Sequence, residues 1–223
     1  MDGMYDAMAA AYAEEPIEQD MSWEQIESPI NYHNITKEDM NNGDGLRTTL
    51  WVAGCSHQCP QCQNPITWNP DNGLPFDEWA QAELWEALSK PWIKGLTLSG
   101  GDPLHCANRT YIGQLAKQVK DRLPGKDIWC YTGYVLSYED ETFLLTDKLG
   151  NTFTYPALAN IDVLCDGPFD FATRQADLEA EKFVPWVGSS NQRVIDIKET
   201  IQAGCIVTRR YDKSGKYTLI KEA

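Results

Sequence analysis

The chain has 223 residues, of which 42% are hydrophobic and 11% aromatic, and its formal net charge at pH 7 is −14. This length and composition are typical of one globular domain with a sizeable core, and an acidic chain without basic patches argues against binding to a nucleic-acid backbone. The sequence has neither an apolar run of membrane-spanning length nor a basic start followed by an apolar signal-peptide stretch, so we expect a cytoplasmic protein without a membrane partner.

Residues 1–30 are predicted to be an acidic N-terminal extension that is partly disordered. Its first 29 residues contain eight acidic residues and no lysine or arginine. A short amphipathic segment through Met21, Trp23 and Ile26 is the alternative to a solvated tail. Residues 31–223 are expected to form a single domain, with a core at about 31–195 and a C-terminal tail at about 196–223.

Strands and helices are predicted to alternate after residue 31. Apolar runs and helical periodicity place strands at 46–53, 95–99, 128–131 and 161–165, and helices at 77–90 and 107–123. One face of the first helix is expected to carry Trp79, Leu84, Trp85 and Leu88. Alternation of this kind indicates an α/β fold with a parallel sheet and right-handed crossovers.

Two further segments are predicted to be β-hairpins added to this core. Residues 146–156 contain a turn at 148–151 between β-prone residues, and the C-terminal tail contains a turn at 212–215. These additions do not change the predicted α/β class.

Three cysteines follow the first of these predicted strands, in the spacing Cys55-x3-Cys59-x2-Cys62. Three thiolates can hold a four-iron four-sulfur cluster and leave one iron without a protein ligand, an open position at which chemistry can occur. His57 lies inside the triplet, so a structural Cys3His zinc site is an alternative. The remaining four cysteines are far apart, and Cys130 and Cys165 are expected to be buried thiols, so no second cluster is predicted.

The predicted strands end in residues suited to ligand binding. The strand at 95–99 runs into Gly100-Gly101-Asp102-Pro103, where bare backbone can approach a ligand at the carboxyl end of a strand. Thr132 and Gly133, then Asp166 and Gly167, end the next two strands on the same predicted rim. Each of these could instead simply terminate its strand, and Asn64, just after the last cysteine, could cap the following turn.

These motifs, in this order, resemble the radical S-adenosylmethionine (SAM) enzymes and, within them, the activating proteins of anaerobic (class III) ribonucleoside-triphosphate reductases. Further stretches that carry the resemblance are Asn31–His33, Gly43–Thr48, Pro124–Trp129, Tyr131–Tyr134, Asp162–Gly167 and Gly188–Arg193. The similarity covers about residues 31 to 195.

The resemblance implies an incomplete (β/α) barrel of radical SAM type that holds one 4Fe-4S cluster and SAM. It implies that the reduced cluster cleaves SAM to methionine and a 5′-deoxyadenosyl radical, which generates a glycyl radical on the large subunit of the reductase. The partners implied are that subunit and a low-potential electron donor such as flavodoxin. No catalytic residue is expected beyond the cluster and SAM.

Residue roles are also implied by the resemblance. Cys55, Cys59 and Cys62 would bind the cluster, and the SAM contacts would be Asn64, Gly100, Gly101, Asp102, Thr132, Gly133 and Asp166.

The chain departs from the family pattern at three positions. Pro168 stands where a lysine usually follows Asp-Gly, Val187 where arginine is common, and Gln63 where an aromatic is frequent. The missing lysine is a candidate partner of the SAM carboxylate, and its replacements Arg193, Arg174 and Lys94 cannot be ranked from the sequence. The alternative functions are activation of another glycyl-radical enzyme, radical SAM chemistry on a small molecule, or a zinc-braced binding module.

Overall fold

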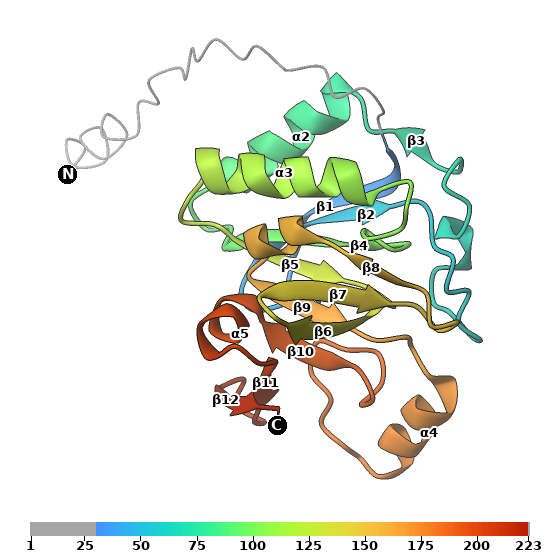
Figure 1. The fold of residues 1–223 in the computed structure, drawn as a ribbon. Coiled ribbons are helices and arrows are strands. Elements are labelled where there is room, and N and C mark those ends of the chain that lie inside the picture. The colour runs from blue at the N-terminus through green and yellow to red at the C-terminus, as the bar shows by residue number, and fades with distance from the viewer. Residues whose placement is uncertain (1–29, 223) are drawn as a thin grey trace, which may run out of the picture.

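The computed structural model describes residues 30–222, which form a mixed α/β fold around a nine-stranded sheet (Figure 1). The predicted extension at residues 1–30, with its amphipathic alternative, lies outside the described residues except for Ile30. The sheet has the order β12-β11-β10-β9-β5-β4-β2-β1-β3. Because β12 and β3 form its two edges, the sheet is open and does not close into a barrel.

The four central strands are parallel, as predicted from their apolar runs. They are β2 (Arg47–Val52), β4 (Gly95–Gly100), β5 (Asp127–Tyr131) and β9 (Val163–Asp166). Antiparallel strands that were not predicted as part of the sheet flank them on both sides. These are β1 (Asn31–Asp39), β3 (Leu74–Pro75) and β10 (Arg193–Asp196). The sheet is therefore mixed rather than wholly parallel.

Two helices cover one face of the sheet, α2 (Glu78–Ser89) and α3 (Arg109–Arg122) (Figure 1). Helix α2 begins after Asp77, whose carboxylate accepts hydrogen bonds from two backbone N–H groups of the first turn. Its residues Leu84 and Leu88 are fully buried, but Trp79 is 84% exposed. The prediction that Trp79 shares their face is wrong, because five residues turn a helix by about 140° from Trp79 to Leu84.

The remaining helical elements are short. They are η1 (Pro65–Thr67), η2 (Pro156–Asn160), α4 (Phe171–Glu179) and α5 (Ile197–Ala203). No helix among residues 30–222 is long and apolar enough to cross a membrane.

A separate three-stranded sheet contains the predicted internal hairpin. Its strands are β6 (Val135–Glu139), β7 (Thr142–Thr146) and β8 (Thr152–Thr154), in the order β6-β7-β8. The turn at 148–151 is confirmed, whereas β6 was not predicted. Leu136, Phe143 and Leu145 are buried in the main core, which fixes this small sheet against the domain. The C-terminal hairpin is also confirmed, with β11 (Val207–Tyr211) and β12 (Tyr217–Lys221) joined by the predicted turn.

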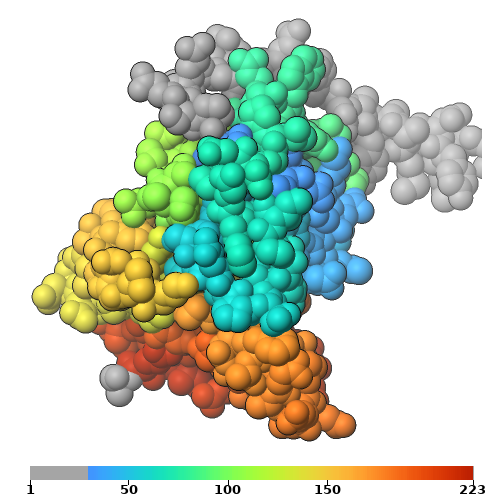
Figure 2. Space-filling model, turned by 90° about the vertical axis from the view of Figure 1, so that its right-hand side faces the viewer, coloured from blue at the N-terminus to red at the C-terminus, as the bar shows by residue number. Residues whose placement is uncertain are grey.

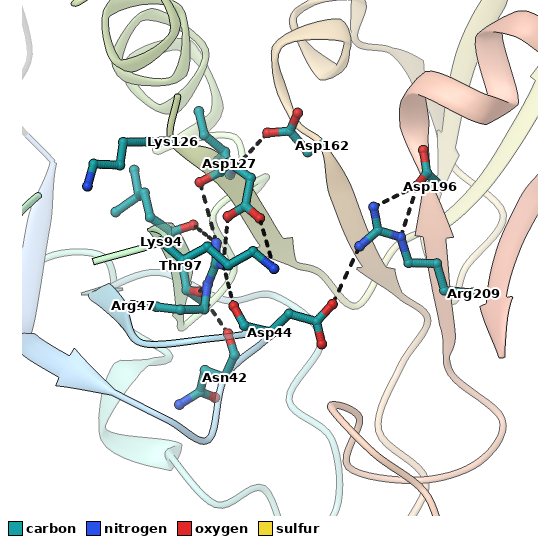
Figure 3. Close-up of polar contacts among 12 residues, drawn as sticks. Asn42, Asp44, Arg47, Lys94, Thr97, Lys126, Asp127, Asp162, Asp196 and Arg209 are labelled. Carbon is teal, nitrogen blue, oxygen red and sulfur yellow. Dashed lines mark hydrogen bonds and ion pairs between the residues drawn. The ribbon is translucent and has the colours of Figure 1, made fainter. Parts of the chain in front are cut away.

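Arg47 joins the amino-terminal ends of the central strands (Figure 3). Its side chain is fully buried and its guanidinium donates to Thr97 Oγ1 at 2.7 Å and to the Leu96 carbonyl at 2.8 Å. Nη1 lies 2.6 Å from Asp127 Oδ1, and the cation lies over the Trp129 ring. A buried arginine is stable only when it is paired and hydrogen-bonded in this way. This polar network lies at the end of the sheet opposite the carboxyl ends of the parallel strands.

Candidate functional site

A cavity of about 360 Å³ is lined by residues that follow the carboxyl ends of the four parallel strands. All of the predicted site residues except Asp166 line it. They are Cys55, Cys59, Cys62, Asn64, Gly100, Gly101, Asp102, Thr132 and Gly133. The expectation that the strand ends share one rim is thus confirmed by the fold. The loop of residues 53–64, called the cysteine loop below, lies between the small sheet and α4 (Figure 2).

Backbone N–H groups point at the sulfurs of the cysteine loop. The N–H of Asn64 donates to Cys62 Sγ at 3.4 Å. Burial raises the pKa of the Cys55 thiol to about 12, and hydrogen bonds from the backbone of His57 and Gln58 act in the opposite direction. Gln58 itself has a φ of 44°, so the loop is held in the left-handed region where few non-glycine residues lie. Sulfurs that accept backbone hydrogen bonds at a cavity wall suit thiolate ligands of an iron-sulfur cluster.

The contacts of His57 argue against its being a fourth metal ligand. Its Nε2 lies 2.9 Å from Asp102 Oδ2, its side chain is 3% exposed, and its ring packs edge-on against Tyr134. Within residues 30–222, no three or more His, Cys, Asp or Glu side chains converge on a point that could hold a single metal ion. A cluster needs no such convergence, because its thiolates bind separate irons. The orientation of His57 therefore disfavours the Cys3His alternative.

Asp102 is the hydrogen-bond centre of the site. It is 1% exposed and accepts from the backbone N–H of Leu104 at 2.8 Å and of Gly133 at 2.9 Å. The hydroxyl of Thr132 also donates to it, at 3.0 Å. These donors meet both carboxylate oxygens and His57 Nε2 lies 2.9 Å from Oδ2, so Asp102 holds the ends of β4 and β5 and the cysteine loop together.

Gly100 and Gly101 are required by backbone packing. Gly100 has a φ of +104°, and a Cβ there would lie 2.7 Å from backbone atoms of Val52. A Cβ on Gly101 would lie 2.5 Å from the carbonyl oxygen of Gly54, in the cysteine loop. Both positions therefore require glycine because the space that a side chain would need is filled by the chain itself, and the predicted close approach to a ligand stays a prediction.

Asp166 lies just behind the cavity wall. It is 1% exposed and accepts from Arg193 Nε at 3.0 Å and from the Leu136 N–H at 2.7 Å. Burial raises the pKa of this carboxyl, whereas the hydrogen bond and charge of Arg193 oppose the rise. The carboxylate holds β9 to the small sheet and leaves its neighbour Gly167 to line the cavity.

The segment Gly188–Gln192 fixes the chain that follows Gly167. The Gln192 side chain accepts from the Gly188 N–H at 2.8 Å and donates to the Gly167 carbonyl at 2.8 Å. Asn191 donates to the carbonyl of Pro168 at 2.9 Å. These contacts give a structural reason for the motif at Gly188–Arg193, which the sequence analysis could connect only with the family resemblance.

Within residues 30–222, Arg174 is the only lysine or arginine that lines the cavity. It lies on α4, which begins after Asp170, whose carboxylate accepts from the Thr173 N–H at 2.6 Å. Among the described residues, its guanidinium has no ion-pair partner. The other two candidate cations are committed elsewhere: Arg193 pairs with Asp166, and Lys94 lies near Asp127 at the opposite end of the sheet.

Several aromatic residues of the cavity were not assigned to the site from the sequence. They are Trp51, Tyr131, Phe169 and Trp186. No motif distinguishes such residues from core aromatics, because their exposure to the cavity depends on how distant segments pack.

A protein-family profile described as a 4Fe-4S single cluster domain matches residues 41–195. Three similar proteins carry the name anaerobic ribonucleoside-triphosphate reductase-activating protein. The one from Pasteurella multocida (strain Pm70) is 39% identical over 165 residues, which cover 73% of this chain and 95% of the relative. That of Enterobacteria phage T4 is 41% identical over 165 residues, or 74% of this chain and 93% of the relative. That of Escherichia coli (strain K12) is 40% identical over 167 residues, with coverages of 74% and 97%.

Proposed function

The chain belongs to the family of anaerobic ribonucleoside-triphosphate reductase-activating proteins, and from this membership we propose that it is a radical SAM activase. Its target is the large subunit of an anaerobic ribonucleoside-triphosphate reductase, on which it generates a glycyl radical. When bound, the 4Fe-4S cluster and SAM supply the radical by reductive cleavage of SAM. The observation that carries this proposal is that the cysteine loop and the ends of the parallel strands meet at one cavity.

Cys55, Cys59 and Cys62 hold the cluster in this proposal. All three line the cavity, and backbone N–H groups support their sulfurs. The open sheet then corresponds to the incomplete (β/α) barrel of radical SAM type, with its cavity at the carboxyl ends of the strands. A volume of about 360 Å³ is within the usual range for small-molecule sites and limits how much water accompanies the ligand.

The predicted SAM contacts fall into three groups. Gly100, Gly101 and Asn64 present backbone and amide groups directly at the cavity wall. The carboxylate of Asp102 orients Thr132 and Gly133. A third group, Asp166 with Arg193, fixes the strand that presents Gly167.

Arg174 binds the carboxylate of SAM in this proposal. Pro168 and Val187 leave the cavity without the two cations that the family pattern supplies, and Arg174 is the remaining cation at its wall. A guanidinium can bind a carboxylate through two parallel hydrogen bonds. Helix α4 thus supplies in this chain a charge that the motif residues do not.

The partners follow from the activity. The large subunit of the reductase provides the glycine, and a low-potential donor such as flavodoxin provides one electron for each turnover. The net charge of −14 disfavours a nucleic-acid partner, and a cytoplasmic location suits a soluble reductase.

Anaerobic reconstitution with iron and sulfide, followed by electron paramagnetic resonance with and without SAM, tests the first step. We expect a reduced-cluster signal that changes when SAM is added, and formation of methionine and 5′-deoxyadenosine. Mixing with an anaerobic reductase should then produce a glycyl-radical signal. Cleavage of SAM without that signal would indicate a substrate other than the reductase. Stoichiometric zinc in place of iron would contradict the proposal that the protein is an enzyme.

Cys59→Ala tests the ligand assignment against a matched cysteine. We expect this variant to fold but to lose cluster assembly and SAM cleavage. Cys106→Ala is the control, since Cys106 is an exposed free thiol outside the triplet. Normal iron content in the Cys59→Ala protein would contradict the assignment.

A further inference from the structure

The turn between β7 and β8 is rigid and projects Lys148 from the small sheet. The Asp147 carboxylate accepts the N–H groups of Leu149 at 2.8 Å and of Asn151 at 2.9 Å. The Asn151 side chain adds a third hydrogen bond to it at 2.8 Å. Gly150, with a φ of +85°, completes the turn. The backbone at Lys148 is therefore fixed by hydrogen bonds on both sides.

Lys148 reaches the cysteine loop, 91 residues away in sequence. Its ammonium Nζ donates to the backbone carbonyl of His57 at 2.5 Å, and His57 lies between Cys55 and Cys59. Figure 2 shows the small sheet and the cysteine loop in contact on one face of the molecule. This contact approaches the loop from outside the cavity, because Lys148 is not among the residues that line it.

The position of this contact brings a positive charge close to the predicted cluster ligands. The Lys148 ammonium binds the carbonyl of His57, which is two residues from both Cys55 and Cys59. A charge at this place acts on a cluster that those cysteines hold.

We propose that Lys148 is a positioning residue of the cysteine loop that raises the reduction potential of the cluster. The inference rests on the proposed function, because it presumes a cluster on the three cysteines. When the cluster accepts one electron from an external low-potential donor, it gains one negative charge and no bond forms or breaks. A nearby ammonium stabilises that added charge, so reduction becomes easier. The small sheet thus serves to bring a cation to the cluster from outside the cavity.

Redox titration of the reconstituted protein, followed by electron paramagnetic resonance without SAM, tests this role. Dithionite is the reductant, and the variants are Lys148→Met, Lys148→Arg and Lys148→Glu. We expect the midpoint potential to fall in the Met variant, to fall further in the Glu variant, and to stay near wild type in the Arg variant. The differences should shrink as salt is added, because Lys148 lies at the surface.

Lys117→Met is the control, since Lys117 is an exposed lysine on α3 that pairs with Asp121. Its potential should equal that of the wild type. Equal potentials in the wild type and the Lys148→Met protein, at equal iron content, would overturn the inference. So would an equal fall in the Met and Arg variants, which would assign the effect to loop geometry alone. Failure of the proposed function is recognised separately, as wild-type protein that holds no cluster or does not cleave SAM.

Discussion

Asp102 lies just after the end of β4, where its carboxylate accepts hydrogen bonds from Leu104, Thr132 and Gly133 and lies 2.9 Å from His57 Nε2. Such a buried carboxylate is stable because both of its oxygens accept hydrogen bonds. Its removal would release the cysteine loop through His57 and the end of β5 through Gly133. The Asp102 side chain therefore fixes the position of the cysteine loop relative to the ends of β4 and β5.

Asp102→Asn should lower the free energy of unfolding by about 3 kcal/mol. The new amide NH2 would face donors, leaving buried polar groups unpaired. Urea unfolding of the cluster-free protein measures the change. Asp121→Asn is the control, because it removes only the exposed pair with Lys117 and should cost less than about 1 kcal/mol. Equal losses in the two variants would refute a central role for Asp102.

Arg174→Gln should weaken SAM binding by about tenfold to a hundredfold, because a charged hydrogen-bonding pair contributes about 1.5–3 kcal/mol. Equilibrium dialysis with the cluster-loaded protein gives the affinity. Decarboxylated SAM sharpens the test: it should bind the wild type more weakly than SAM, whereas the variant should not distinguish the two. The exposed Lys198 on α5 provides a control, Lys198→Gln, with unchanged affinity. Discrimination by the variant as strong as that of the wild type would refute the contact.

Among the elements, the parallel strands could be predicted from the sequence because each is an apolar run that ends in a turn signal. Strand β1 could not, because most of its residues are polar. It is a strand because it pairs with β2, for example Ile35 opposite Leu50. Likewise β10 is only four residues long and is defined by antiparallel pairing with β9. Pairing with a neighbouring strand decided these elements, and the local sequence pattern does not show it.

The site likewise contains residues that could be predicted from the sequence and residues that could not. Cysteine spacing and the Gly-Gly-Asp motif predicted residues that do line the cavity. A loop that follows a parallel strand must lie at the carboxyl edge of the sheet, so its position follows from the strand. Nothing in the sequence separated Arg174 from Arg193. Arg174 reaches the cavity because Asp170 starts α4 beside it, and Arg193 does not because Asp166 binds it.

The turn of the small sheet depends on Asp147. The side chain and backbone of Asn151, and the Leu149 N–H, hold the pKa of this carboxyl below its ordinary value of 3.8. The ionised form therefore stabilises the turn at pH above 3.8, and this contribution is lost as the pH falls through the lowered pKa.

Asp147→Ala should remove that contribution at neutral pH. Hydrogen exchange at the amides of Leu149 and Asn151 should become faster, while amides of the buried β5 stay protected. Asp140→Ala, in the other turn of the same sheet, is the control for a general loosening. Unchanged exchange at both amides would show that the turn holds without the carboxylate.

At the scale of the whole molecule, the C-terminal hairpin contacts the loop that precedes β2. Arg209 on β11 donates two hydrogen bonds to Asp196, at 2.9 and 2.6 Å, and lies 3.8 Å from Asp44 (Figure 3). The Tyr211 hydroxyl donates to the same Asp44 at 2.9 Å, across 167 residues of sequence. These contacts join the far strands of the open sheet to the loop that precedes β2.

Arg209→Gln should therefore destabilise the domain, whereas Arg210→Gln should not. Arg209 is 13% exposed and paired, so its loss leaves Asp196 as a largely buried charge and costs about 3 kcal/mol. Its neighbour Arg210 is exposed on the other side of the same strand, and its replacement should change the free energy of unfolding by less than about 0.5 kcal/mol. Urea unfolding of both variants measures the difference. If both unfold at the wild-type urea concentration, the C-terminal hairpin does not stabilise the domain, and the domain core ends at β10.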